Sequence, residues 1–162
     1  MFIKAASRTD VPAMREIFNE VLRNSNSIYR EDEVTLEERY AWFDEKIQQG
    51  YPIFGAYEGE LLIGYAGYGS WRAAQGYRKT VELTIYVDSS HRGNGTGKAL
   101  MQTIINQATA DGYHVMTGAI DSANQSSIDF HKRFGFTETA HMPEVALKNG
   151  VWLNLVFMQK LL

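Results

Sequence analysis

A short glycine-rich segment carries the clearest chemical signal in this sequence. It reads Arg92-Gly93-Asn94-Gly95-Thr96-Gly97-Lys98 and stands between an apolar strand pattern and an apolar helix pattern. Glycines leave backbone N–H groups uncovered, and the N–H groups at the start of a helix, together with the helix dipole, favour anions. Arg92 and Lys98 add positive charge beside them. The segment therefore predicts a ligand that carries phosphate.

The spacing of the glycines excludes two common phosphate loops. A Walker loop needs four residues between its first glycine and a Gly-Lys pair, with Ser or Thr next. Here three residues separate Gly93 from Gly97, and Ala99 follows Lys98. A dinucleotide fingerprint needs Gly-x-Gly-x-x-Gly, whereas this loop has Gly-x-Gly-x-Gly.

Glu82 is the second candidate for chemistry. It lies between Val81 and Leu83 in the predicted strand before the loop, and a carboxylate in a core strand is costly unless it is paired or solvated. Two interpretations are open: a strand-face glutamate in a surface ion pair, or a proton acceptor whose pKa is raised by burial.

The elements that position these groups follow from hydrophobic periodicity. The strand Val81–Val87 precedes the loop, and the helical pattern starts at Lys98. Strands mix with helices along the whole chain, which predicts an α/β or α+β fold around one mostly antiparallel sheet. The other predicted elements are the strand Phe2–Ala5, helices starting after Thr9-Asp10 and at Thr35, the strands Pro52–Tyr57, Leu61–Gly69 and His114–Ile120, the helix Asn124–Arg133, and the strands Thr137–Met142 and Val151–Lys160 around the loop Pro143–Gly150.

The composition limits the class of protein. The length of 162 residues predicts a single domain over residues 1–162, and 44% hydrophobic with 22% charged residues is ordinary for a globular chain. A net charge of −3 without a basic cluster argues against a nucleic-acid partner. Without cysteines, the scattered histidines make no metal site. No apolar run is long enough for a membrane span and no signal segment is recognisable, so we expect a cytoplasmic protein.

The pattern Arg-x-x-Gly-x-Gly, here Arg92, Gly95 and Gly97, resembles the GCN5-related N-acetyltransferase (GNAT) superfamily. The likeness extends over essentially the whole chain, and it implies the GNAT fold with a mixed, mostly antiparallel sheet and helices on both faces. Further short matches resemble the phosphinothricin and methionine sulfoximine acetyltransferases, also described as L-amino-acid N-acyltransferases. These matches are Ala41-Trp42-Phe43, Gly50-Tyr51-Pro52, Gly64-Tyr65-Ala66, Trp71-Arg72, Thr80-Val81-Glu82, Tyr86-Val87, His131 with Gly135-Phe136, and Trp152 with Phe157-Met158-Gln159.

The resemblance implies acetyl-CoA as cosubstrate and no metal. In such enzymes the central strand splays from its neighbour, and the pantetheine arm pairs with the freed backbone. Here that backbone would be Ile85, Tyr86 and Val87, with the Ile85 amide as donor to the thioester oxygen. The pyrophosphate would bind Arg92, Gly93, Asn94, Gly95, Thr96, Gly97 and Lys98. Asn124 and Arg133 would contact the far end of the cofactor.

The resemblance also implies roles in catalysis and in acceptor binding. Glu82 would take the proton of the substrate ammonium group. His131 stands where many members carry a tyrosine that protonates the leaving sulfur; it either does that work or is a structural helix histidine. The acceptor would meet Tyr29, Arg72, Gln75, Gly76, Tyr77, Arg78 and Phe134. Leu83, Asn149 and Val151 depart from the pattern of the branch, which leaves the acceptor open.

The leading hypothesis is acetyl-CoA-dependent N-acetylation of a small amino acid or an amino-acid-like toxin, by direct transfer. Acetylation of protein N-termini or lysines is an alternative, against which the bulky residues around Ile28–Arg30 and Trp71–Arg78 argue. A non-catalytic acyl-CoA sensor is the third. Related enzymes commonly form homodimers, and surplus aromatic residues (Trp42, Trp152 and Phe157) lead us to expect one here.

Overall fold

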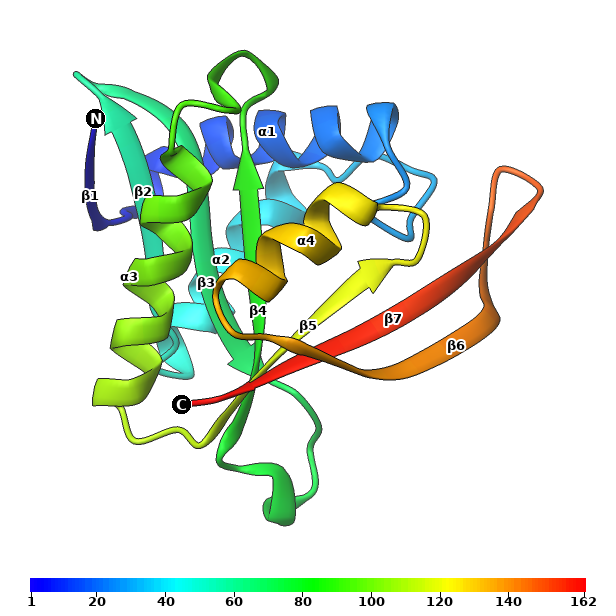
Figure 1. Ribbon diagram of the computed structural model, residues 1–162. Helices are drawn as coiled ribbons and strands as arrows, with labels where there is room; N and C mark the ends of the chain where they lie inside the picture. Colours follow the sequence, from blue (N-terminus) through cyan, green and yellow to red (C-terminus); the bar gives the residue numbers. More distant parts are fainter.

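The computed structural model describes all residues, 1–162, as one seven-stranded sheet with helices on both of its faces (Figure 1). The elements are β1 (Phe2–Ala5), α1 (Val11–Asn24), α2 (Leu36–Gln48), β2 (Ile53–Glu58), β3 (Leu61–Ser70), β4 (Thr80–Val87), α3 (Thr96–Ala110), β5 (Val115–Asp121), α4 (Gln125–Arg133), β6 (Thr137–Lys148) and β7 (Val151–Leu161). The strand order is β1-β2-β3-β4-β5-β7-β6, and only β4 and β5 are parallel. The predicted fold class is confirmed.

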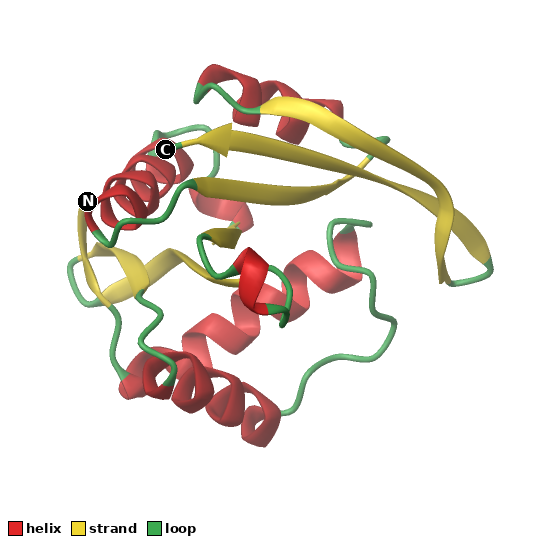
Figure 2. Ribbon diagram, turned by 90° about the horizontal axis from the view of Figure 1, so that it is seen from below, coloured by secondary structure: helices red, strands yellow, loops and turns green.

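The two faces of the sheet pack against different helices, which lie above and below it in Figure 2. One core holds the buried side chains of α3 with alternate residues of the central strands, including Ala66, Tyr68 and Val81. A second core holds Met14 and Ile17 of α1 with Phe43 of α2 and Tyr65 of β3. Because side chains alternate along a strand, the odd-numbered side chains of β4 point toward α3 and the even-numbered ones point toward α1 and α2.

Strands β4 and β5 separate soon after they begin. Their pairing covers Thr80 to Glu82 on β4 and Val115 to Thr117 on β5, and it ends there. Figure 1 shows β4 and β5 diverging beyond that point, with α4 beside the space between them. The β5-facing edge of residues 83–87 of β4 therefore has backbone groups without a strand partner.

Two local predictions can be checked against the caps and turns. The capping box at the start of α2 is confirmed, because Glu38 N–H donates to Thr35 Oγ1 (3.1 Å) and Thr35 N–H donates to Glu38 Oε2 (2.7 Å). The predicted loop Pro143–Gly150 is wrong. Strand β6 runs on to Lys148, with irregular register between Met142 and Ala146, and only Asn149-Gly150 turns the chain.

Candidate active site

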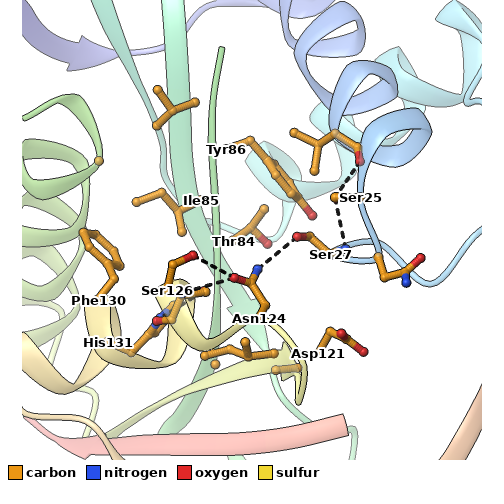
Figure 3. Close-up of a pocket in the computed structure, with 18 of the residues that line it drawn as sticks. Ser25, Ser27, Thr84, Ile85, Tyr86, Asp121, Asn124, Ser126, Phe130 and His131 are labelled. Atoms are coloured by element: carbon orange, nitrogen blue, oxygen red, sulfur yellow. Dashed lines mark hydrogen bonds between the residues drawn. The ribbon is translucent and has the colours of Figure 1, made fainter. Parts of the chain in front are cut away.

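A cavity of about 880 Å³ occupies the space where β4 leaves β5. Its walls come from β4, β5, the loop after α1, the glycine loop and α4 (Figure 3). Eight of the residues predicted to act on ligand or substrate line it: Ile85, Tyr86, Val87, Arg92, Gly93, Gly97, Asn124 and His131. The cavity thus joins the unpaired edge of β4 to the glycine loop.

The glycine loop has the backbone that an anion site requires. Gly93 and Gly95 adopt φ values of +79° and +92°, which are strained for other residues. Helix α3 begins immediately after Gly95, and its first intrahelical bond runs from Ala99 N–H to Gly95 O (3.0 Å). The N–H groups of Gly97 and Lys98 precede that bond and have no acceptor within the helix. The predicted cluster of backbone donors is therefore formed at the mouth of the cavity.

The polar side chains of the loop have local partners. Asn94 Oδ1 accepts a hydrogen bond from Thr96 Oγ1 (2.7 Å), which fixes the turn into α3. Arg92 is exposed, and its Nε donates to Val87 O (3.2 Å) at the end of β4. Lys98 is exposed on the first turn of the helix. Arg92 lines the cavity and Lys98 does not.

Glu82 faces α2, on the other side of the sheet from α3. It does not line the cavity, although its strand neighbours Leu83 and Thr84 do. Burial raises the pKa of its carboxyl group, and the positive charge of Lys46 on α2 opposes that rise. The interpretation as a simple surface ion pair does not fit, because no salt bridge forms at Glu82.

His131 lies on α4, on the opposite face of the sheet, and only 3% of it is exposed. Its Nδ1 lies 2.7 Å from the carbonyl oxygen of Ser127, so Nδ1 carries the proton and donates it to that oxygen. Nε2 is buried without a hydrogen-bond partner. Desolvation lowers the pKa of the imidazole, which is neutral in this setting. Its Nε2 therefore presents a lone pair rather than a proton.

Of the two predicted contacts to the far end of the cofactor, Asn124 lines the cavity and Arg133 does not. Asn124 caps α4, where its Oδ1 accepts from Ser127 N–H (3.2 Å), and its Nδ2 lies 3.3 Å from Ser27 Oγ across the cavity (Figure 3). Arg133 is exposed near the end of α4 and does not line the cavity.

The predicted acceptor residues are not gathered in the cavity wall. The segment Arg72 to Arg78, with Gln75, Gly76 and Tyr77, forms an exposed loop before β4. In it the Arg72 guanidinium lies over the ring of Trp71, and Arg78 Nη1 donates to Gln75 O (3.1 Å). Phe134 packs against Phe130, which does line the cavity.

Tyr29 has a polar role that its sequence context did not indicate. Its hydroxyl group donates to Asp121 Oδ1 (2.6 Å) and lies 3.0 Å from Asn154 O. Asp121 is buried and lines the cavity. Tyr29 thus ties the loop after α1 to the ends of β5 and β7, in addition to any contact with an acceptor.

Lys148 is a structural residue that the sequence analysis missed. Its side chain is buried, and Nζ donates to the carbonyl oxygens of Leu22 (3.0 Å), Ser25 (2.9 Å) and Ile28 (2.8 Å). These carbonyls belong to the end of α1 and to the loop that lines the cavity with Ser25, Asn26 and Ser27. Lys148 therefore fixes the cavity wall from the tip of the β6–β7 hairpin. No local sequence signal indicates such a contact.

Comparison with known proteins places this geometry in a family. The model of the acetyltransferase (GNAT) family matches residues 11–136. An L-methionine sulfoximine/L-methionine sulfone acetyltransferase from Pseudomonas paraeruginosa is 46% identical over 159 residues, which cover 97% of this chain and 92% of that protein. Phosphinothricin N-acetyltransferases are also among the relatives.

Two solved structures have the same fold. The Salmonella typhimurium acetyltransferase, solved with its cofactor acetyl-CoA, superposes with a TM-score of 0.95 at 39% identity and covers 99% of this chain and 93% of its own. A ribosomal-protein-alanine N-acetyltransferase from Brucella melitensis superposes with a TM-score of 0.98 at 36% identity over 100% of both chains.

No helix of the present protein is long and apolar enough to cross a membrane.

Proposed function

This chain belongs to the acetyltransferase (GNAT) family, and on that premise we propose that it acetylates the α-amino group of a small amino acid. The acceptor class includes toxins of the methionine sulfoximine, methionine sulfone or phosphinothricin type, and acetyl-CoA is the acetyl donor. The observation that carries the proposal is the unpaired edge of residues 83–87, which leads directly to the amide cluster of Gly97 and Lys98.

The residues along this edge fit an extended ligand with a phosphate group at one end. Backbone groups of Ile85 and Val87 on the unpaired edge, with Tyr86 between them held by β3, bind an amide-containing arm in the way that a sheet edge binds an added strand. The N–H groups at the start of α3 bind the phosphates, with Arg92 and Lys98 beside them. The Ile85 N–H stabilises the negative charge that develops on the thioester oxygen.

Two groups handle protons on opposite sides of this edge. Glu82, whose pKa is raised by burial, accepts the proton of the acceptor ammonium group, directly or through water, and leaves a neutral amine able to attack the thioester directly. His131 stands on the side of the leaving sulfur. Because its Nε2 holds a lone pair, it passes a proton to the sulfur only after Nε2 has taken one up.

A protein N-terminus is the second candidate acceptor. The similarity to the ribosomal-protein-alanine N-acetyltransferase favours it. Residues 72–78 are exposed and do not line the cavity, whereas the sequence had suggested that they close its wall.

Release of free thiol from acetyl-CoA, measured with a panel of acceptors, tests the proposal. The panel holds methionine sulfoximine, methionine sulfone, phosphinothricin, common amino acids, short peptides with N-terminal alanine, and aminoglycosides. We expect turnover with the first four groups. A preference for peptides would identify a protein acceptor, and binding of acetyl-CoA without turnover would identify a sensor.

We also propose that the protein forms a symmetric dimer through the β6–β7 hairpin. Strand β6 is one of the two edge strands of the sheet, and apolar side chains on this hairpin are exposed: Met142, Val145, Leu147, Val151 and Trp152. Of the three aromatic residues expected to need cover, Trp152 is 57% exposed, whereas Trp42 and Phe157 pack against neighbours. Light scattering should give twice the chain mass, and Trp152→Glu should give the monomer.

A further inference from the structure

Glu82 does not line the large cavity, but the next side chains on its face of β4 do. Because side chains alternate along a strand, Glu82, Thr84 and Tyr86 all point to the face that α1 and α2 cover. Thr84 and Tyr86 line the cavity, and Figure 3 shows both on the side of β4 opposite Ile85. A proton that leaves an amine in the cavity therefore has to pass another group before it arrives at Glu82.

A second, small cavity lies on the other side of Thr84, between α2 and the strands β2, β3 and β4. Its volume is about 10 Å³, which is the size of a site for one water molecule. Three of its lining residues carry side chains that form hydrogen bonds: Lys46, Tyr65 and Thr84. Thr84 is the only residue that lines both this small cavity and the large one.

The small cavity borders the surroundings of Glu82. The Lys46 ammonium group fills the space that a side chain at Gly69 would need, and Gly69 is the residue of β3 that pairs with Glu82. Burial lowers the pKa of Lys46 and raises the pKa of Glu82, and each of the two charges opposes the shift of the other. Residues two apart on a strand are about 6.5 Å apart. One water molecule is therefore enough to join the Thr84 hydroxyl group to the Glu82 carboxylate.

The hydroxyl group of Thr84 is free to take part in such a path. Thr84 is half-buried, and its hydroxyl group makes no hydrogen bond within the protein. The buried side-chain atoms without a partner are Arg39 Nε and His131 Nε2, so Thr84 Oγ1 is not among them and is accessible. A hydroxyl group accepts one proton and donates another. Two other hydroxyl groups fit less well, because Tyr86 lines only the large cavity and Tyr65 lines only the small one.

We propose that the hydroxyl group of Thr84 relays the proton of the acceptor ammonium group to Glu82. This inference rests on the proposed function. Thr84 Oγ1 accepts the proton that leaves the nitrogen, while its own proton passes through one water molecule in the small cavity to the Glu82 carboxylate. The nitrogen keeps the electron pair of the broken N–H bond and becomes the neutral nucleophile. The hydroxyl group is restored, and the carboxylate becomes a carboxylic acid.

Replacement of Thr84 by valine and by serine tests the proposal. Valine keeps the shape of threonine without the hydroxyl group, whereas serine keeps the hydroxyl group. At neutral pH, the rate of acetyl transfer in the first turnover, measured by rapid mixing with saturating substrates, should fall about ten- to hundredfold in Thr84→Val and stay within about threefold in Thr84→Ser. The loss in Thr84→Val should shrink as the pH rises through the pKa of the acceptor ammonium group, because a neutral amine does not need the relay. Thr137→Val, exposed on β6, is the matched control.

A double variant separates the relay from other roles of Thr84. If Thr84 acts through Glu82, Thr84→Val should cost less than about twofold in a Glu82→Gln background, because both changes disable one path. The affinity of Thr84→Val for acetyl-CoA, measured by calorimetry, should stay within about twofold of the wild-type value.

Three outcomes would overturn the inference. A wild-type rate in Thr84→Val, beside a slow Glu82→Gln, would exclude the relay and leave the proposed function intact. A loss in Thr84→Val that is the same at every pH and adds to the loss in Glu82→Gln would identify a role in packing. A higher acceptor KM with an unchanged rate of transfer would identify a binding residue. Failure of the wild-type protein to release thiol with any acceptor would instead contradict the proposed function itself.

Discussion

Glu82 and His131 lie on opposite faces of the central sheet, on the two sides of the gap between β4 and β5. Glu82 lies on the face of the sheet that α2 covers, near Lys46 of that helix. His131 packs against Gly118 on the face that α4 covers. In the proposed function, these two groups exchange protons with the reactants from opposite faces and do not compete for them. In the proposed function the acceptor amine approaches from the side of Glu82, and the sulfur leaves on the side of His131.

Glu82→Gln should lower kcat by about 10²–10⁴-fold, because the amide keeps the shape of the side chain but cannot accept the ammonium proton. Steady-state kinetics with saturating acetyl-CoA and acceptor measure this loss. Glu60→Gln, in the exposed β2–β3 turn, is the matched control and should leave kcat unchanged. A Glu82→Gln enzyme with wild-type kcat and the wild-type pH profile would require a different base.

The acidic limb of the pH–rate profile should depend on Lys46. Burial raises the pKa of Glu82, so the base is lost as pH falls through a value above that of an ordinary glutamate. The Lys46 ammonium group lies over Gly69, directly opposite Glu82 on β3, and lowers that pKa. Lys46→Met should therefore move the limb to higher pH, and Lys46→Arg should not. If the acidic limb does not move in Lys46→Met, the limb does not report the titration of Glu82.

Gly97→Val should weaken acetyl-CoA binding without unfolding the protein. A Cβ at this position meets Phe130 at 3.7 Å, an ordinary contact, and it points into the cavity beside the amide cluster. Loss of even one hydrogen bond to a charged phosphate predicts a KM for acetyl-CoA raised by about tenfold or more. Ala110→Val, which places the same side chain at the exposed far end of α3, is the control. Unchanged affinity by calorimetry in a folded Gly97→Val protein would contradict the phosphate site.

The glycine loop and the strand before it could be predicted because their signals are local. Glycine spacing, strand alternation and helical periodicity all lie within residues 81–108, and the structure has them in that order. The turn Asn149-Gly150 is also local, and both of its residues adopt positive φ. This dipeptide is a strong hairpin signal, but the sequence analysis assigned the whole segment Pro143–Gly150 to the loop. The irregular register around Met142 to Ala146 is what lets β6 continue past the proline.

The rest of the cavity wall could not be predicted, because its contacts join residues far apart in the sequence. Tyr29 bonds to Asp121, 92 residues away, and Lys148 bonds to Leu22, 126 residues away. The sequence patterns say only that Lys148 lies in a predicted loop between two strands. They do not say that three carbonyl oxygens surround its ammonium group.

Lys148→Met should both destabilise the protein and damage the acceptor side of the site. Methionine leaves the carbonyl oxygens of Leu22, Ser25 and Ile28 without their donor, and it removes a cation from the C-terminal end of α1. We expect a loss of about 2–4 kcal/mol in the free energy of unfolding. In protein that remains folded, the acceptor KM should rise more than the KM for acetyl-CoA. Lys132→Met, exposed on α4, is the control. A fully stable variant would show that the three contacts contribute nothing net.

The acceptor carboxylate provides the sharpest test of the substrate class. A free amino acid presents an ammonium group for Glu82 and a carboxylate that must be fixed at a distance, and a guanidinium group binds a carboxylate through two parallel hydrogen bonds.

Arg72 and Arg78 are exposed in the loop that leads into β4. Arg78 already donates to Gln75 O, whereas Arg72 only lies over Trp71, so Arg72 has the freer guanidinium group. Arg72→Ala should raise the acceptor KM by about tenfold and leave acetyl-CoA affinity unchanged. Arg8→Ala, which changes an exposed arginine outside the predicted site, is the control. Wild-type enzyme should likewise prefer an amino acid to the amine formed by its decarboxylation. Similar kcat/KM values for that pair would mean that no carboxylate is recognised, and the amino-acid assignment would fail.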